Sequence, residues 1–578
     1  MNHLPILYSL PAFLLAAVLT GCQKETLDAP EEPEGPLLFR DVTEERGLAF
    51  DHEAGPTGSY FMPQIIGSGA AFLDYDNDGR LDLYLLNNGG PKSSAVNRLF
   101  HQEKDGHFRD VSAGSGLDFA GHCMGVAVGD INNDGWPDVL VTQYGGSRLF
   151  LNNGDGTFAD ISREAGLEDL LWGTSASFVD YDRDGWLDLV VVHYVDYGPG
   201  RPCTDFAGRT DYCPPQVFAG TVTSLYHNAG RLPLGDKARV RLQDVTLASG
   251  LGRRPGPGLG VVCADFDGDG WPDILVANDG KPNHLWINQK NGTFAEQALA
   301  RGLAFNAQGQ ALANMGIALG DVDGDSRFDV FVPHLTEEPP GLWCQRSRGA
   351  FEDRAATAGL ASTRGRGTGF GAVFADFDLD GALDLAVVNG RVMHGRTPAI
   401  VVRPHSLWTD YAERNRLFIN DGRGRFLDVS PANDPFCGRA DIYRGLAYGD
   451  FDDDGAMDLL VTSVAGPARL FRNVASKRGH WLSVRVVDPE LHRDAYGAEV
   501  TALAGERSWK RWANPGSSFL CSNDPRLHFG LGATERVESF EVIWPNGDRE
   551  RFDGCAADQA VELRKGHRQP VPRTRQKP

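Results

Sequence analysis

The sequence lacks the features of several common functional classes. It carries 56 Lys and Arg against 78 Asp and Glu, a formal net charge of −22, and such an acidic chain is unsuited to binding nucleic acid through phosphate contacts. It has no CxxC or Cys/His spacing typical of zinc, no nucleophile elbow and no dinucleotide fingerprint. Its one signal-like apolar stretch, LPAFLLAAVL at residues 10–19, is too short to span a bilayer. These absences disfavour nucleic-acid binding and the common enzyme classes.

The N-terminus predicts export. LTGC at residues 19–22 looks like a bacterial lipobox, which implies cleavage before Cys22 and lipidation of its thiol. We therefore expect a signal peptide over 1–21 and a lipid-anchored, flexible, Pro-rich tether over 22–36. Because no Lys or Arg precedes the apolar stretch, an ordinary secretory signal stays the alternative. The expected location is the outer membrane or cell surface, or otherwise the periplasm or the medium, with the lipid as the only membrane attachment.

Aspartate, in contrast, is abundant and falls on a fixed register. A nine-residue pattern with polar, mostly acidic side chains at positions 1, 3, 5 and 9 occurs seven times, and these four positions hold 27 of the 78 acidic residues. A period this regular points to a repeat architecture. The copies are DYDNDGRLD (74–82), DINNDGWPD (130–138), DYDRDGWLD (180–188), DFDGDGWPD (265–273), DVDGDSRFD (321–329), DFDLDGALD (376–384) and DFDDDGAMD (450–458).

The Asp loops predict calcium sites. Their carboxylates, a carbonyl at position 7 and a Gly at position 6 match the start of an EF-hand loop, whereas magnesium prefers to keep several waters. Asn132 and Ser326 mark the weaker second and fifth sites. Seven bound ions would move the net charge from −22 to about −8. The expected ligands are Asp74, Asp76, Asp78, Arg80, Asp82, Asp130, Asn132, Asp134, Trp136, Asp138, Asp180, Asp182, Asp184, Trp186, Asp188, Asp265, Asp267, Asp269, Trp271, Asp273, Asp321, Asp323, Asp325, Arg327, Asp329, Asp376, Asp378, Asp380, Ala382, Asp384, Asp450, Asp452, Asp454, Ala456 and Asp458.

The segments around each loop predict an all-β fold. Short apolar runs separated by Gly, Asn and Asp turns are typical of strands, and four strands in each of seven repeats make a seven-bladed β-propeller over residues 37–474. FRDVTEERGL (39–48) matches the strand that ends a repeat, whereas the seventh repeat stops at LFRN (470–473). The N-terminal strand is therefore expected to complete the last blade and leave no open edge.

Two sets of motifs resemble known families. The Asp loops with their LFxNxGxGxF segments resemble the FG-GAP/VCBS repeats of integrin α-type propellers. GHWLSVRVV, YGAEV, LHFGLG and VIWPNGDRERF resemble an ASPIC/UnbV domain, expected at 479–566 as a small all-β unit before a basic disordered tail at 567–578. The combination is similar to the cartilage acidic protein family. This resemblance implies a secreted or surface calcium-binding propeller with no established catalytic activity.

A polar residue stands five positions after each closing Asp, where the second strand should end on the face opposite the Asp loops. Insertions at 195–224 and 391–414 follow two of these positions, and long loops often carry function. Cys203 and Cys213 bracket a loop in the first insertion and predict a disulfide. The alternative is that the polar residues only cap strand ends. The seven are Asn87, Gln143, His193, Asn278, His334, Asn389 and Ser463, of which His193, Asn278, His334 and Asn389 are the ligand-face candidates.

Three functions stay open. We favour a calcium-stabilised binding or adhesion module for an extracellular or envelope protein or glycan. A polysaccharide-cleaving enzyme would need acid/base groups, for which His193, His334, Tyr194 and Asp196 are the candidates. A calcium-dependent structural component of an envelope assembly is the third. Because no catalytic motif is present, we predict no catalytic residue.

Overall fold

The structure is a computed structural model that describes residues 35–230, 240–361, 366–395, 406–476 and 478–573. The predicted signal peptide, the lipidation site Cys22 and residues 574–578 lie outside these ranges. Within them, no helix combines the length and the apolar character that crossing a membrane requires.

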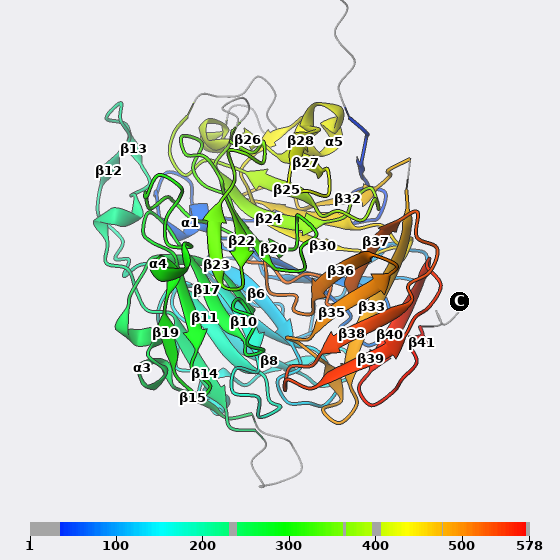
Figure 1. The fold of residues 1–578 in the computed structure, drawn as a ribbon. Coiled ribbons are helices and arrows are strands. Elements are labelled where there is room, and N and C mark those ends of the chain that lie inside the picture. The colour runs from blue at the N-terminus through cyan, green and yellow to red at the C-terminus, as the bar shows by residue number, and fades with distance from the viewer. Residues whose placement is uncertain (1–34, 231–239, 362–365, 396–405, 477, 574–578) are drawn as a thin grey trace, which may run out of the picture.

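Seven four-stranded antiparallel sheets form the blades of a β-propeller, as the repeat predicts (Figure 1). Blade I comprises β2 (Ala70–Leu73), β3 (Asp82–Leu85), β4 (Arg98–Gln102) and β5 (Phe108–Asp110). Blade II comprises β6 (Cys123–Gly129), β7 (Asp138–Gln143), β8 (Arg148–Asn152) and β9 (Phe158–Asp160). Blade III comprises β10 (Gly173–Val179), β11 (Asp188–His193), β14 (Ser224–Asn228) and β15 (Leu242–Asp244). Blade IV comprises β16 (Gly258–Ala264), β17 (Asp273–Asn278), β18 (His284–Asn288) and β19 (Phe294–Glu296).

The last three blades follow the same order. Blade V comprises β20 (Ala318–Gly320), β21 (Asp329–Val332), β22 (Gly341–Ser347) and β23 (Ala350–Asp353). Blade VI comprises β24 (Gly369–Ala375), β25 (Asp384–Asn389), β27 (Arg416–Asn420) and β28 (Phe426–Asp428). Blade VII comprises β30 (Tyr443–Gly449), β31 (Asp458–Ser463), β32 (Arg469–Asn473) and the N-terminal β1 (Phe39–Asp41). Each Asp loop joins the first and second strands of its blade.

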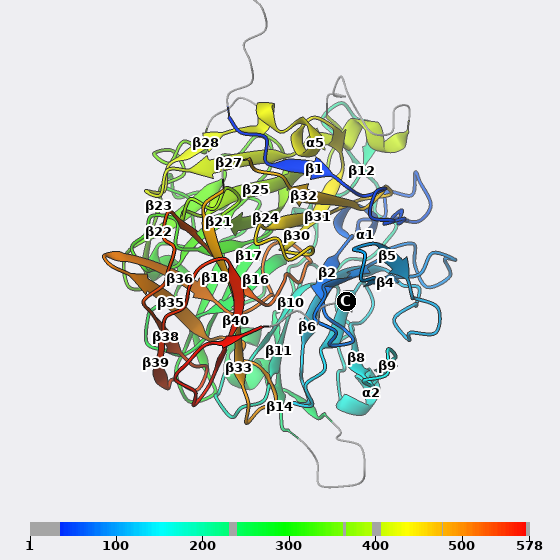
Figure 2. The same ribbon diagram turned by 90° about the vertical axis from the view of Figure 1, so that its right-hand side faces the viewer.

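The N-terminal strand closes the ring, which confirms the prediction from the complementary half-repeats. β1 pairs antiparallel with β32, with Phe39 opposite Asn473, and Figure 2 shows the blue β1 beside β32. Phe39 is fully buried and its ring centroid lies 5.1 Å from that of Phe377 in the neighbouring blade. β1 therefore covers the edge of β32 that the incomplete seventh repeat would leave unpaired.

The innermost strands are rich in small residues because seven of them converge around one axis. A Cβ added at Gly69 would lie 2.5 Å from the carbonyl oxygen of Met124 in the next blade, and one at Gly316 would lie 2.5 Å from that of Phe370. Both distances are shorter than real Cβ contacts, so these positions require glycine for the close approach of neighbouring blades. The small residues before each Asp loop follow from this geometry.

Short helices, 3-10 turns and two-stranded ribbons lie in the connections between the blade strands. The helices are α1 (Pro63–Ile66), α2 (Ser162–Ala165), α3 (Thr246–Ser249), α4 (Ala298–Arg301) and α5 (Asp434–Cys437), with 3-10 turns at Pro215–Val217, Leu251–Arg253, Leu407–Tyr411 and Ser430–Ala432. Two-stranded ribbons pair β12 (Cys203–Thr204) with β13 (Thr210–Asp211), and β26 (Glu413–Arg414) with β29 (Ala440–Asp441). The first ribbon carries the Cys203–Cys213 disulfide, as predicted.

The C-terminal segment folds into a second all-β unit that packs on one side of the propeller, orange and red in Figures 1 and 2. One sheet has the order β34–β33–β40–β41, with β37 also paired to β33; the other has the order β36–β35–β38–β39. The strands are β33 (His480–Asp488), β34 (Arg493–Asp494), β35 (Glu499–Ala504), β36 (Arg507–Trp512), β37 (Leu527–Gly532), β38 (Ser539–Ile543), β39 (Arg549–Asp553), β40 (Gln559–Arg564) and β41 (Val571–Pro572).

The sequence does not predict how this domain joins the propeller. The connection from β36 to β37, residues 513–526, enters the centre of the ring; we call it the plug. The backbone N–H of Val126 in blade II donates to the carbonyl of Leu520 at 3.1 Å, and the N–H of Ile317 in blade V donates to that of Ser518 at 3.0 Å. The plug thus satisfies backbone groups of inner strands that would otherwise face a channel.

The expected tail at 567–578 is wrong in its described part. β41 pairs antiparallel with β40, with Val571 opposite Glu562, and the Arg573 guanidinium lies 3.8 Å from a carboxylate oxygen of Asp74. Basic composition suggested disorder, but a free edge of β40 and an acidic loop nearby give this segment partners. The all-β unit therefore extends beyond the predicted end at 566.

Candidate functional site

The Asp loops share one hydrogen-bonding pattern, which the first loop illustrates. The side chain of Asp74 accepts hydrogen bonds from the backbone N–H groups of Asp78 and Gly79, both at 3.0 Å. Asp82 accepts one from Tyr75 at 3.3 Å and one from Gln102, at the end of the third strand, at 2.7 Å. In all seven loops the Asp at position 1 accepts a hydrogen bond from the backbone N–H at position 6. In all seven, the Asp at position 9 accepts one from the backbone N–H at position 2. The first and last aspartates therefore shape the turn.

The remaining carboxylate oxygens fit a cation. Asp74, Asp76 and Asp78 place oxygen atoms within 4.8 Å of one another. Burial raises the pKa of Asp74 to about 6, that of Asp130 to about 7 and that of Asp450 to about 8, because a desolvated carboxylate resists ionisation. Oδ1 of Asp180 is buried without a hydrogen bond in the described structure. These clusters could hold a metal ion, and a hard cation would satisfy such oxygens.

The fifth loop departs from the others at position 6. Ser326 has a φ of 64°, a left-handed conformation that glycine adopts without strain and a side chain disfavours. Its backbone N–H still donates to Asp321 at 2.8 Å, so the turn forms. The substitution lowers the intrinsic stability of this turn.

The Asn or Gln that ends the third strand ties neighbouring blades together. Nδ2 of Asn152 donates to the carbonyl of Tyr75 in the preceding loop at 2.8 Å, and Nε2 of Gln102 donates to that of Phe451 across the closure of the ring at 2.8 Å. The LFxN signature predicted the strand but not this role. Six of the seven Asp loops are coupled in this way to the blade after them. In blade V, Nε2 of Gln345 donates instead to the carbonyl of Phe328 in its own loop.

The seven loops differ in the cations that already face them. In the seventh loop, Arg472 lies 2.5 Å from Asp452 and 3.0 Å from Asp454, and Arg478 lies 2.9 Å from Asp454. Arginine cannot give up its charge in a protein, so these guanidinium groups compete with a metal ion for the same oxygens. We therefore expect the weakest metal binding at the seventh loop, which the sequence pattern alone ranks with the strong ones.

The C-terminal domain covers the face that carries the Asp loops. Arg493 donates to Asn133 of the second loop at 2.8 Å and to the carbonyl of Gly185 in the third at 3.2 Å. His528 contacts the carbonyl of Gly455 in the seventh loop at 2.9 Å, and the hydroxyls of Ser508 and Ser326 lie 3.2 Å apart at the fifth. Loop geometry and domain docking are thus linked.

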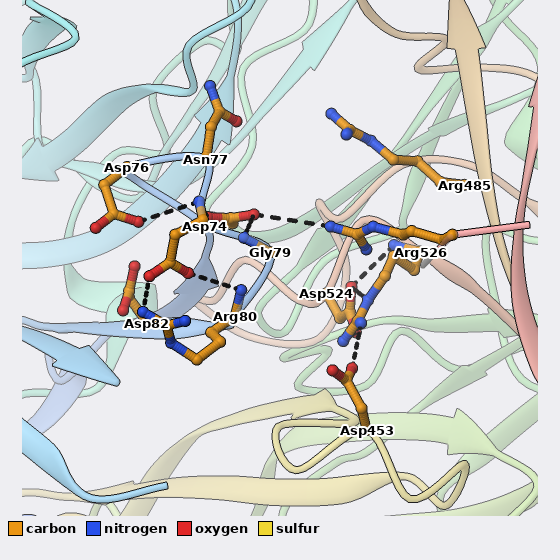
Figure 3. A network of polar contacts seen from close by, with 12 residues as sticks. Asp74, Asp76, Asn77, Gly79, Arg80, Asp82, Asp453, Arg485, Asp524 and Arg526 are labelled. Carbon is orange, nitrogen blue, oxygen red and sulfur yellow. Dashed lines mark hydrogen bonds and ion pairs between the residues drawn. The ribbon is translucent and has the colours of Figure 1, made fainter. Parts of the chain in front are cut away.

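A cleft remains between this domain and the first and seventh loops. Its volume is about 790 Å³, and Arg80, Asp453, Trp481 and Arg526 are among the residues that line it. Figure 3 shows Arg485 extending toward the first loop, and Arg526 bonded to Asp524 and, at 2.7 Å, to Asp453 of the seventh loop. The positive and negative side chains largely pair with one another. The cleft is therefore part of the interface between the C-terminal domain and the propeller rather than a binding pocket.

The candidate ligand-face residues lie at the predicted strand ends, but they are buried. His193 is 0%, Asn278 1%, His334 2% and Asn389 1% exposed. Nε2 of His193 lies 2.7 Å from Asp169, and Nδ2 of Asn389 donates to the carbonyl of Arg414 at 2.6 Å. Buried side chains whose polar atoms already make hydrogen bonds in this way cap the ends of strands. Their prediction as ligand contacts is wrong, because the connections after the second strands fold over them.

The acid/base candidates do not form an active site in the described structure. Tyr194 is 2% exposed and its hydroxyl donates to Asp279 at 2.6 Å. Burial lowers the pKa of His334 to about 4, and both of its ring nitrogens have partners, Pro339 at 2.6 Å and Asn314 at 2.9 Å. Asp196 is exposed but has no accessible partner among the other three candidates.

Aromatic side chains, which the sequence did not predict, form a partly exposed group on this opposite face. Phe61, His122, Tyr144, Tyr197 and Phe218 are half-buried and form a connected group, the aromatic patch. The Phe61 ring centroid lies 5.0 Å from that of His122, 5.3 Å from that of Tyr144 and 5.6 Å from that of Tyr197. Tyr197 lies 5.1 Å from Phe218. These residues come from four separate segments, so spacing along the chain could not reveal the patch.

The comparisons with known proteins confirm the resemblance to FG-GAP repeats and to an ASPIC/UnbV domain. FG-GAP-like repeats match residues 74–141, 130–191, 265–332 and 402–461, and the ASPIC and UnbV family matches 488–570. Cartilage acidic protein 1 of Mus musculus and that of Homo sapiens are each 28% identical over 369 residues, 59% of this chain. The match spans about half the length of these relatives, 52% and 51% respectively.

Among solved structures, an Agrocybe aegerita lectin that recognises non-reducing terminal N-acetylglucosamine matches with a TM-score of 0.37 and 14% identity over 69% of this chain and 86% of the lectin. The N-terminal part of BBS1, in complex with ARL6, matches with a TM-score of 0.36 and 10% identity over 77% of this chain and 99% of that one. The chain therefore combines FG-GAP-like repeats with an ASPIC and UnbV domain and is a homologue of cartilage acidic protein 1.

Proposed function

We propose that this protein is an exported, calcium-binding β-propeller that acts as a surface or periplasmic binding module for protein or glycan, and that it is not an enzyme. The observation that carries the proposal is the aromatic patch. Half-exposed rings bury large areas on contact and lose little conformational entropy, and here a rigid ring of blades positions them. Aromatic side chains are also enriched at binding hot spots.

Calcium acts as scaffolding in this proposal. The Asp loops lie on the face that the C-terminal domain covers, away from the aromatic patch, and they connect the first two strands of each blade. A cation there would neutralise carboxylates that burial now keeps hard to ionise. The clustered oxygens of Asp74, Asp76 and Asp78 and the buried, unpaired Oδ1 of Asp180 support this role.

Export is supported by the lipobox-like LTGC at 19–22 and by the Cys203–Cys213 disulfide, because disulfides persist in oxidising compartments. Cys22→Ser should move the protein from the membrane fraction to the soluble one, since the lipid supplies the attachment. Unchanged membrane association of Cys22→Ser would exclude lipid anchoring at this residue.

Two classes of variant test whether the Asp loops provide stability while the aromatic patch on the opposite face binds the ligand. Asp78→Ala should lower calcium content by about one ion per chain and lower the melting temperature, because lost metal affinity appears as lost folded-state stability. Tyr144→Ala and Phe218→Ala should abolish binding to a panel of purified polysaccharides and envelope proteins, with calcium content unchanged. Leu247→Ala, at a side chain that is 76% exposed elsewhere on the surface, is the matched control.

The measurement is ligand binding alongside calcium stoichiometry, well below the melting transition. Binding to polysaccharides or to proteins identifies the class of partner. Loss of binding in Asp78→Ala while the propeller stays folded would show that calcium contacts the ligand, and the two-face proposal would be wrong.

A further inference from the structure

One position on the third strand distinguishes the Asp loops from one another. It immediately precedes the Asn or Gln whose backbone N–H donates to the last Asp of the loop in the same blade. In blades I to VII it is occupied by His101, Leu151, His227, Ile287, Cys344, Ile419 and Arg472. Oxygen-only loops therefore alternate with loops that gain a nitrogen, sulfur or cationic neighbour.

In blade I the histidine faces two carboxylates. Nδ1 of His101 lies 3.2 Å from Oδ1 of Asp82 and 3.5 Å from Oδ2 of Asp76. His101 is 9% exposed, and its Nδ1 makes no hydrogen bond of acceptable geometry within the described part of the chain. A buried imidazole nitrogen thus points into the loop without a settled partner.

In blade III the histidine at the same position is half-buried, and its Nδ1 hydrogen-bonds to Asp188. Nδ1 of His227 lies 3.2 Å from Oδ1 of Asp188 and 3.3 Å from Oδ2 of Asp182. The buried Oδ1 of Asp180, in the same loop, has no hydrogen bond in the described structure. In both blades a tyrosine at loop position 2 packs edge-on against the imidazole, Tyr75 at 6.0 Å and Tyr181 at 6.1 Å.

The spacing suits a small ion with nitrogen and oxygen ligands. Two ligands that each lie about 2.0–2.2 Å from a tetrahedral Zn²⁺ ion are roughly 3.3–3.6 Å apart, close to the distances between Nδ1 and the carboxylate oxygens in blades I and III. Calcium takes oxygen ligands, whereas imidazole suits zinc and other first-row transition metals. The ligand atoms of Asp76, Asp82 and His101, and those of Asp182, Asp184 and His227, lie within 4.8 Å of one another.

The other blades do not offer this set. Leu151, Ile287 and Ile419 supply no donor atom. Arg472 brings its own positive charge to the seventh loop. At the fifth loop, Arg354 lies 3.4 Å from Asp323, one of the two carboxylates grouped with Cys344. In blade I the facing Arg80 pairs with Asp78, which leaves Asp76 and Asp82 to His101.

We infer that the loops of blades I and III bind a first-row transition-metal cation of the Zn²⁺ type through His101 and His227, whereas the oxygen-only loops take calcium. The inference rests on the proposed function, because it takes the Asp loops to be cation sites. It divides them into loops for calcium and loops for a transition metal. The donors of blade I are separated by up to 25 positions in the chain, so no zinc-like spacing could reveal them.

The experiment uses the full chain, stripped with chelator and reloaded with Zn²⁺ in an excess of Ca²⁺. Metal analysis should find two zinc ions per chain. His101→Leu should lose one, His227→Leu the other and the double variant both, with calcium at the oxygen-only loops unchanged. Leucine stands at this position in blade II, so the blade accommodates it. With Co²⁺ as the probe, the visible absorption of nitrogen-ligated cobalt should fall in the same order.

A gain of site provides the matched control. Leu151→His places an imidazole at the same register of blade II, and the zinc count should rise by one. Complete displacement of zinc by calcium in the unmodified chain, or an unchanged zinc count in the double variant, would overturn the inference. So would a gain of calcium in His101→Leu without loss of zinc, because the imidazole would then act as a protonated counter-ion. Absence of calcium from the zinc-loaded double variant would contradict the calcium proposal instead.

Discussion

Phe519, at the tip of the plug, offers the sharpest test of how the two domains hold together. Its side chain is 0% exposed, and its ring centroid lies 4.9 Å from that of Phe370 on the inner strand of blade VI. Phe519→Ala removes a buried ring and leaves a cavity that the surrounding inner strands cannot close, which costs about 3–5 kcal/mol. A loss of this size is comparable with the net stability of many domains.

The effect should appear first as release of the plug. In the unmodified protein we expect the propeller and the C-terminal domain to unfold together, because residues 513–526 bond to inner strands of several blades. In Phe519→Ala the calorimetric transition should split, with the C-terminal domain melting first. Hydrogen exchange should rise at the N–H groups of Val126 and Ile317, which donate to plug carbonyls.

Phe206 provides the control, since it is a phenylalanine that is 100% exposed. Phe206→Ala should change the free energy of unfolding by less than about 0.5 kcal/mol. If Phe519→Ala unfolds in one transition at the temperature of Phe206→Ala, the plug does not couple the domains and the reasoning fails.

Three further outcomes follow from the contacts. Deletion of 37–48 should lower the melting temperature of the whole propeller, because it removes β1 and exposes the edge of blade VII; an unchanged melting curve would contradict strand sharing. The double variant Cys203→Ser, Cys213→Ser should weaken the first insertion by roughly 2–3 kcal/mol, since the bond closes a loop with a separation of 10 residues, and exchange in this loop should rise while the global transition stays. The pKa of His334 is lowered from 6.5 to about 4 in the folded protein, so on acidification the unfolded chain takes up this proton before the folded one does. Up to about 3 kcal/mol of the free energy of unfolding should therefore be lost as the pH falls from about 6.5 to 4. The acid sensitivity of unfolding should shrink in His334→Gln.

Much of the scaffold was predictable because its determinants are local. An Asp loop needs only nine consecutive residues to show its chemistry, and the complementary half-repeats at 39–48 and 470–473 sufficed to predict how the ring closes. The Cys203–Cys213 pair was also predictable, because both residues lie in one short loop. These features depend on residues that are close in sequence or related by the repeat.

The features that sequence analysis missed depend on distant segments. Burial of His193 and Asn389 follows from how the connections after each second strand fold back, which no spacing encodes. The aromatic patch joins four segments. The plug left one signal, the apolar Phe519–Leu520–Cys521 in a loop otherwise rich in Ser, Asn and Pro, and its meaning depends on a channel that only the assembled blades create.

The position of the C-terminal domain constrains what the Asp loops can do. Arg493, His528 and Arg526 contact the second, third and seventh loops, and the plug enters the ring beside them. A ligand that bound a cation in the second, third or seventh loop directly would have to displace this domain, together with a buried phenylalanine at its tip. The aromatic patch on the opposite face is accessible without any such rearrangement. Metal bound in the loops would therefore act on recognition indirectly, by fixing the loop shape on which the domain docks and so the ring that positions the patch.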